Sequence, residues 1–116
     1  MTQRELIKLF QDILKTIQLI EKFLSEVEFN EFESNEEKIF AVTRAIEIIG
    51  EAVKNIPQSI RDKYSNIPWK AIAGMHDKLI HEYWQIDVGI IWKTTQEDIP
   101  ILKALIIRII NESQNN

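Results

Sequence analysis

The sequence has no cysteine, which excludes disulfides, cysteine-ligated zinc or iron–sulfur sites and thiol catalysis. Its 116 residues include only three glycines and three prolines. A glycine-rich phosphate-binding loop is therefore absent, and a β-sandwich with many turns is not expected. The remaining side chains that could carry out a reaction are carboxylates, lysines, tyrosines and two histidines, His76 and His81.

Long apolar runs are also missing. No stretch approaches 18 uncharged apolar residues, so no transmembrane helix is predicted. Polar residues interrupt the beginning of the chain, Met1 to Glu5, and this is not typical of a signal peptide. We therefore expect a cytoplasmic protein without a membrane partner, formed by one helical domain over residues 1–116.

The formal net charge is −4, which argues against strong non-specific binding of nucleic acid but leaves a local basic patch open. Much of the acidic excess lies between residues 26 and 37, where a solvated loop and a helix N-terminus, or a docking site for a basic partner, would account for it. The second half of the chain is close to neutral. A polyanion would therefore not be repelled there.

Apolar residues recur at steps of three and four along most of the chain, which predicts helices. The expected helices cover residues 3–25, 36–55, 58–64, 67–83 and 88–112, with a kink or break near Thr94 and Pro100 in the last one. Asn35 and Asp87 are predicted N-caps. Gly50 lies in the middle of a helix, which indicates a close approach of another helix. The predicted fold class is all-α, an antiparallel bundle of about four main helices plus a short one.

One helical segment, residues 75–84, gathers polar groups that could carry chemistry. Asp77 and His81 are four residues apart and share a helix face, so Asp77 could fix the tautomer of His81. His76 and His81 are five apart and miss the i, i+4 spacing of helical metal ligands, and no metal site is expected. From the residues alone, a structural role and acid–base catalysis both stay open.

Several stretches spread along nearly the whole chain match a known family. They are Arg44–Ala52, Ile67–Met75, Leu79–Tyr83, Ile86-Asp87 with Ile91-Trp92, and Asp98–Leu102. In these stretches and in their order, the sequence resembles the HEPN superfamily, in particular its HepT-like toxin branch.

This resemblance implies a ribonuclease toxin that needs no metal or other cofactor and acts at a cleft shared by a homodimer. The family motif reads Arg, four residues, His, one residue, Tyr, with a polar residue directly after the Arg. Its histidine falls on His81, its polar residue on Asp77 and its tyrosine on Tyr83. The resemblance further implies that a nucleotidyltransferase antitoxin of the MNT type is the partner. By the same resemblance, that antitoxin is expected to neutralise the toxin by AMPylation of Tyr83.

The chain departs from the family at the motif arginine, which is replaced by His76. An arginine holds phosphate with paired, permanently charged donors, and imidazole cannot reproduce this. Two readings stay open. Either His76 and His81 divide the acid and base roles, with protonated His76, Lys78 or Lys70 contacting phosphate, or the chain is an inactive HEPN module that dimerises and binds the antitoxin.

Overall fold

The computed structural model describes residues 1–81 and 87–114, with the backbone alone for Ile80 and His81. The regular elements of the described chain are all helices, joined by short loops, and these residues contain no strand. The elements are α1 (Gln3–Phe23), α2 (Phe29–Glu33), α3 (Glu36–Lys54), α4 (Gln58–Lys63), α5 (Trp69–His81), α6 (Val88–Lys93), the π-helical segment η2 (Thr94–Asp98) and α7 (Ile99–Gln114). The prediction of an all-α bundle is confirmed.

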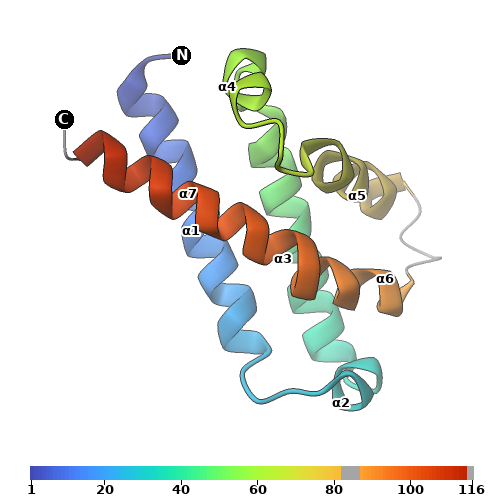
Figure 1. Cartoon of the computed structure of the whole chain (residues 1–116). Helices are drawn as coiled ribbons and strands as arrows, with labels where there is room; N and C mark the ends of the chain where they lie inside the picture. The colour runs from blue at the N-terminus through green and yellow to red at the C-terminus, as the bar shows by residue number, and fades with distance from the viewer. Residues whose placement is uncertain (82–86, 115–116) are drawn as a thin grey trace.

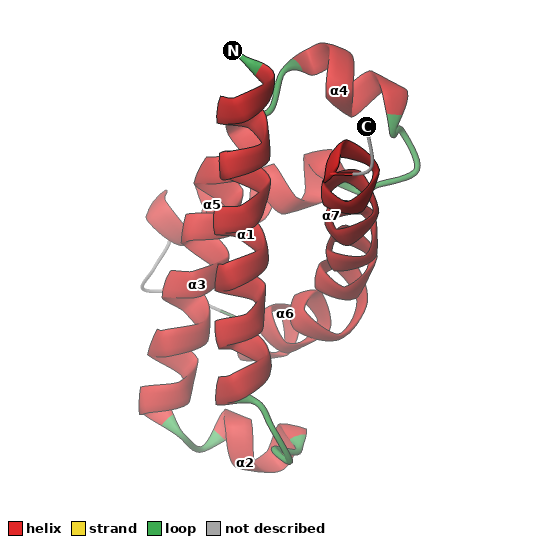
Figure 2. Cartoon of the chain, turned by 90° about the vertical axis from the view of Figure 1, so that its left-hand side faces the viewer, coloured by secondary structure: helices red, strands yellow, loops and turns green. Residues whose placement is uncertain are grey.

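Helices α1 and α3 form an antiparallel pair, joined through α2 at the lower end of the molecule (Figure 1). Helix α5 packs on α3, and α7 runs obliquely across α1. Figure 2 shows α5 and α7 on different sides of the α1–α3 pair, and both chain termini at the end of the bundle where α4 lies. Helix α5 is therefore held mainly by one neighbour, α3, and that contact positions the residues of interest.

Side-chain caps start the helices where the sequence predicts them. Asn35 accepts the backbone N–H of Lys38 at the start of α3, and the Asp87 carboxylate accepts those of Gly89 and Ile90 at the start of α6. At α1, Thr2 and Glu5 form a reciprocal capping box. Both predicted N-caps are confirmed.

The core consists of the apolar stripes that the periodicity predicts. The most fully buried side chains come from α1, α3 and α7, and α2, α5 and α6 add one large residue each. They include Phe10, Ile13, Ile17, Ile20, Phe32, Ile46, Ile49, Ile72, Ile91, Leu102 and Ile106. Because isoleucine is β-branched, its abundance alone would favour strands. The three- and four-residue spacing places these isoleucines on helix faces instead.

The predicted break near Thr94 and Pro100 takes the form of the π-helical segment η2. The backbone N–H of Ile99 donates to Thr94 O, five residues back. Pro100 has no N–H to donate to Gln96, so regular α-helical pairing cannot continue through this point. The last helical region is therefore split into α6, η2 and α7 rather than bent at a single residue.

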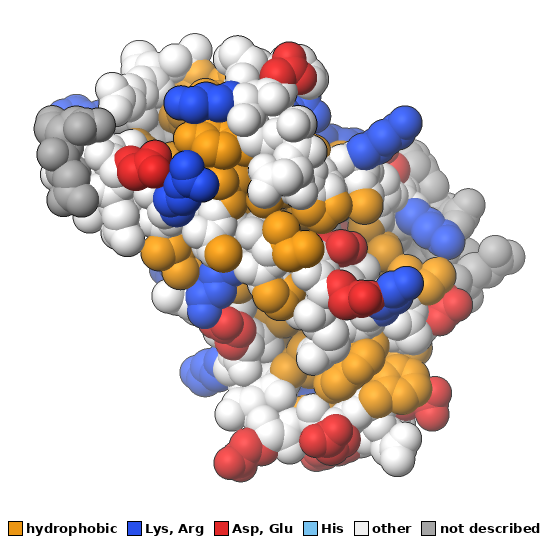
Figure 3. Space-filling view, in the orientation of Figure 1, with side chains coloured by type: hydrophobic (Ala, Val, Ile, Leu, Met, Phe, Trp, Pro, Cys, Tyr) orange, Lys and Arg blue, Asp and Glu red, His pale blue; other side chains and the backbone are white. Residues whose placement is uncertain are grey.

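The acidic stretch contains a helix that the sequence does not predict. Residues 29–33 form α2, and Phe32 on it is fully buried. Phe29 and Phe32 both pack against Trp92 of α6. Their ring centroids lie 5.8 Å (Phe29) and 5.4 Å (Phe32) from that of Trp92. The expected loop between 26 and 35 is therefore wrong in part. Several acidic side chains lie at this lower end of the molecule, beside hydrophobic ones (Figure 3).

Within residues 1–81 and 87–114, no helix is both long and apolar enough to cross a membrane.

Candidate active site

A close contact between α3 and α5 fixes the segment that carries the candidate site. A Cβ built on Gly50 of α3 would overlap the Cβ of His76 and lie 3.0 Å from its Cγ. Gly50 therefore lets the backbone of α5 approach α3, as its position in the middle of a helix predicts. The contact buries His76, whose side chain is only 7% exposed.

His76 lies between two carboxylates. Its Nε2 is 3.1 Å from Oε2 of Glu51 on α3, and its Nδ1 is 3.4 Å from Oδ1 of Asp77 on α5. Both contacts can be hydrogen bonds to carboxylates only when both ring nitrogens carry a proton. His76 therefore links α5 to α3 through Glu51, and in this arrangement its ring is turned away from solvent.

Asp77 is exposed and belongs to a second contact between the same two helices. Lys54 Nζ of α3 donates to Asp77 Oδ1. The hydrogen bond from Lys54 holds the pKa of the Asp77 carboxyl below its ordinary 3.8. Desolvation opposes this shift, and the hydrogen bond with His76 is a smaller effect that lowers the pKa further. The described partners of Asp77 are thus Lys54 and His76. The pairing with His81 that the spacing predicts lies outside the described side chains.

His81 is the last described residue of α5, and its side chain, like the whole of Tyr83, falls outside the described residues. The helix boundary expected at Tyr83 cannot be compared for the same reason. Lys70 and Lys78 are described and exposed. The structure therefore brings His76 and Asp77 together, with Lys54 and Glu51, while Lys70 lies two turns before Asp77 on the same helix.

Sequence reasoning missed Glu51 and Lys54, which bind the two motif residues from α3. The signal for them is present, because both follow Gly50 within about one helical turn. What the sequence does not contain is the pairing of α3 with α5. A separate ion pair on α3, Arg44–Glu47 at 3.2 Å, takes no part in this cluster.

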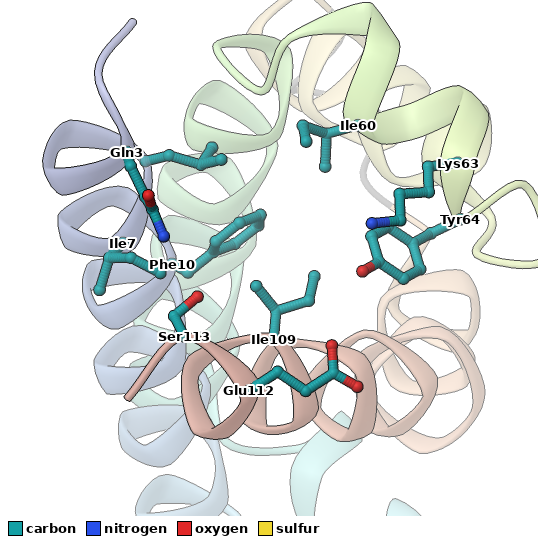
Figure 4. Close-up of a pocket in the computed structure, with 10 residues that line it drawn as sticks. Gln3, Ile7, Phe10, Ile60, Lys63, Tyr64, Ile109, Glu112 and Ser113 are labelled. Carbon is teal, nitrogen blue, oxygen red and sulfur yellow. The ribbon is translucent and has the colours of Figure 1, made fainter. Parts of the chain in front are cut away.

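No group of three or more histidine, aspartate or glutamate side chains is placed to hold a metal ion within the described parts of the chain. A separate cavity of about 290 Å³ opens between α1, α4 and α7 (Figure 4). Phe10, Ile60 and Ile109 line it, and Lys63 and Tyr64 point toward it. None of the described candidate residues lines this cavity.

The fold and the site define a class: a small helical protein whose polar cluster lies on one helix, α5, backed by a second, α3. Comparison with known protein families identifies the family. The model of the family described as "Ribonuclease HepT-like" matches residues 13–109. The chain belongs to this HepT-like ribonuclease family.

Similar proteins carry ribonuclease names. The chain is 50% identical over 94 residues to a protein of Thermococcus cleftensis named a probable ribonuclease HepT, covering 81% of this chain and 86% of that one. It is 42% identical over 112 residues to a protein of Methanocaldococcus jannaschii that is provisionally named an RNase. The match covers 97% of this chain and 93% of that one. A third, from Caldanaerobacter subterraneus and also provisionally named an RNase, is 39% identical over 104 residues, covering 90% and 93%. No solved structure matches the chain.

Proposed function

We propose that this protein is a metal-independent endoribonuclease, the toxin of a toxin–antitoxin pair, acting at a cleft between two copies of the chain. The observation that carries the proposal is the family match over residues 13–109, together with relatives of nearly equal length that carry ribonuclease names. The cluster on α5 supports it, because the motif residue Asp77 is exposed on this helix, one turn before His81. The substrate class is RNA.

In the proposed reaction His81 moves the proton. As a base it takes the proton of a ribose 2′-hydroxyl, O2′ attacks the adjacent phosphorus, and the bond from phosphorus to O5′ breaks. The leaving O5′ receives a proton from water, and protonated His81 then returns its proton to solvent. The products are a 2′,3′-cyclic phosphate and a 5′-hydroxyl end. Asp77 orients the site, and Lys70 and Lys78 are the candidate cations for the negative charge that develops on the phosphate.

The burial of His76 favours a second candidate function. A motif arginine would offer a guanidinium to phosphate, whereas His76 is held between Glu51 and Asp77 with 7% of its side chain exposed. In that arrangement it has no free donor for RNA. The second candidate is a catalytically inactive module that forms a homodimer and binds a nucleotidyltransferase antitoxin. In both cases Tyr83 is the proposed site of AMPylation.

Three proteins distinguish the two functions: the wild type, His81→Ala and His76→Arg. An active ribonuclease requires that the wild type cleave single-stranded RNA, leave a DNA of the same sequence intact because DNA lacks the 2′-hydroxyl, and lose cleavage in His81→Ala. The inactive module requires that only His76→Arg cleave. If none of the three cleaves RNA, the ribonuclease proposal is wrong.

The partner proposal has a separate test. Co-expression with a neighbouring nucleotidyltransferase should add the mass of AMP to the peptide that contains Tyr83, and Tyr83→Phe should abolish this gain. A mass gain that persists in Tyr83→Phe would contradict the assignment of that residue. Toxicity on expression without the partner, absent in His81→Ala, would support the toxin role.

A further inference from the structure

A groove runs along the first turns of α5, between this helix and α4. Its volume is about 610 Å³. It is lined on the α4 side by Arg61 and Gln58, and on the α5 side by Lys70, Gly74 and Asp77. The groove therefore ends at a residue of the candidate active site.

The cations of this groove are available to a ligand. Arg61 and Lys70 make no side-chain hydrogen bond or ion pair with any described residue, and Nε of Arg61 is buried without a partner. The two acids in the groove already have donors. Gln58 Nε2 donates to Asp62 Oδ1 at 2.8 Å, and Lys54 pairs with Asp77.

Two hydrogen bonds hold the Arg61 side of the groove in place. The buried indole of Trp69, at the start of α5, donates its Nε1–H to Arg61 O at 3.1 Å and to Tyr64 O at 2.9 Å. They fix the end of α4 against α5. A buried guanidinium N–H without an acceptor is unfavourable, so a movement of the Arg61 side chain that let a phosphate in the groove accept this N–H would be favoured.

The helix register continues the groove toward the proposed catalytic residue. Lys70, Gly74, Asp77 and His81 follow one another at steps of three and four, so their positions form one stripe along α5. From Lys70 to His81 the helix rises about 16 Å. A single strand of a few nucleotides spans that length, whereas one small anion does not.

We infer that this groove binds the phosphate backbone of single-stranded RNA, with Arg61 and Lys70 contacting phosphates next to the one that reacts. The inference rests on the proposed ribonuclease function and adds how the substrate is held. Recognition is by charge and is therefore independent of base sequence.

The binding probe is a labelled single-stranded oligonucleotide with 2′-O-methyl riboses, which cannot undergo transfer to O2′. The slope of log K against log salt is negative, and Arg61→Gln and Lys70→Gln should each make it less steep by about 0.7. This is the value for one lost phosphate contact on a single strand. Lys63→Gln is the matched control. It removes the same charge from the same helix, but Lys63 points into the other cavity (Figure 4), so binding should be unchanged.

Gly74 offers a second pair of variants that does not depend on the half-buried Arg61. A Cβ at Gly74 has open space around it, with nothing within 4 Å, so side chains are tolerated there. Gly74→Glu and Gly74→Gln have the same shape and differ in charge. Gly74→Glu should bind the probe more weakly at low salt, and the difference should shrink as salt rises.

Cleavage of unmodified RNA is measured in parallel, so the two proposals fail separately. If the wild type cleaves RNA while Arg61→Gln, Lys70→Gln and Gly74→Glu bind like their controls, the groove does not bind RNA and the ribonuclease proposal stands. If the wild type neither binds the probe nor cleaves RNA, both proposals are wrong. Melting curves of each variant separate lost binding from lost folding.

Discussion

Replacement of Gly50 by alanine tests the close contact on which the candidate site is built. Alanine in the middle of an exposed helix is normally favourable by up to about 1 kcal/mol over glycine. At Gly50 the added methyl would overlap the Cβ of His76 and lie 3.3 Å from its Cα. Neither atom can rotate away, so α5 itself must move. Overpacking of this kind costs about 1–3 kcal/mol.

The expected net result for Gly50→Ala is a loss of about 1–2 kcal/mol in the free energy of unfolding. For a chain of this size that loss lowers Tm by roughly 3–8 °C. Gly74→Ala is the matched control, because a Cβ there meets nothing within 4 Å and the helix propensity gain remains. That variant should be as stable as the wild type or more stable.

The assay is urea unfolding followed by circular dichroism, at one protein concentration, because self-association would make stability depend on concentration. His76→Ala keeps the Cβ and should leave the cost of Gly50→Ala in place, whereas His76→Gly should remove most of it. If Gly50→Ala and Gly74→Ala change stability equally, the overlap with His76 does not exist and the described packing of α5 on α3 is wrong.

Three further predictions concern stability. The pKa of Asp77 is lowered in the folded state, so the ionised carboxylate stabilises the fold above pH 3.8. This stabilisation is lost as pH falls through the folded pKa. Asp77→Asn should therefore flatten the acid side of a plot of stability against pH. Burial, and to a smaller extent Glu97, raise the pKa of Asp98 in the folded state. The folded state is therefore favoured while Asp98 is protonated, and this advantage is lost as pH rises through the folded pKa. Asp98→Asn should be more stable than the wild type near neutral pH and equally stable well below pH 3.8. Asp87→Ala removes the acceptor for two N–H groups at the start of α6 and should cost about 1 kcal/mol in urea unfolding, and an unchanged midpoint would contradict the cap.

Most of the fold could be predicted from the sequence because its helices are long and strongly periodic. The caps Asn35 and Asp87 and the break before Pro100 depend on neighbours in the chain, and all three are found. Helix α2 was missed because five residues are too few for a periodic pattern. Its stability depends on Phe32 contacting Trp92, sixty residues later in the chain.

For the candidate site too, local patterns could be predicted and contacts between distant residues could not. Spacing and the family motif predict which residues of α5 matter, but not that His76 is buried against Glu51 or that Lys54 takes Asp77. These pairings join residues more than twenty positions apart, and they exist because Gly50 admits α5 to α3. The groove with Arg61 likewise depends on how α4 meets α5, which no local pattern encodes.

Cleavage of RNA through His81 without a metal ion is the proposed activity of the chain. The most direct measurement is the cleavage rate of a single-stranded oligoribonucleotide by purified wild type and by His81→Ala, both with excess EDTA. We expect the wild type to cleave the RNA and leave a 2′,3′-cyclic phosphate, with a rate unaffected by EDTA. We expect the rate of His81→Ala to be lower by at least about 100-fold. Cleavage that EDTA abolishes, or that His81→Ala retains in full, would contradict this proposal.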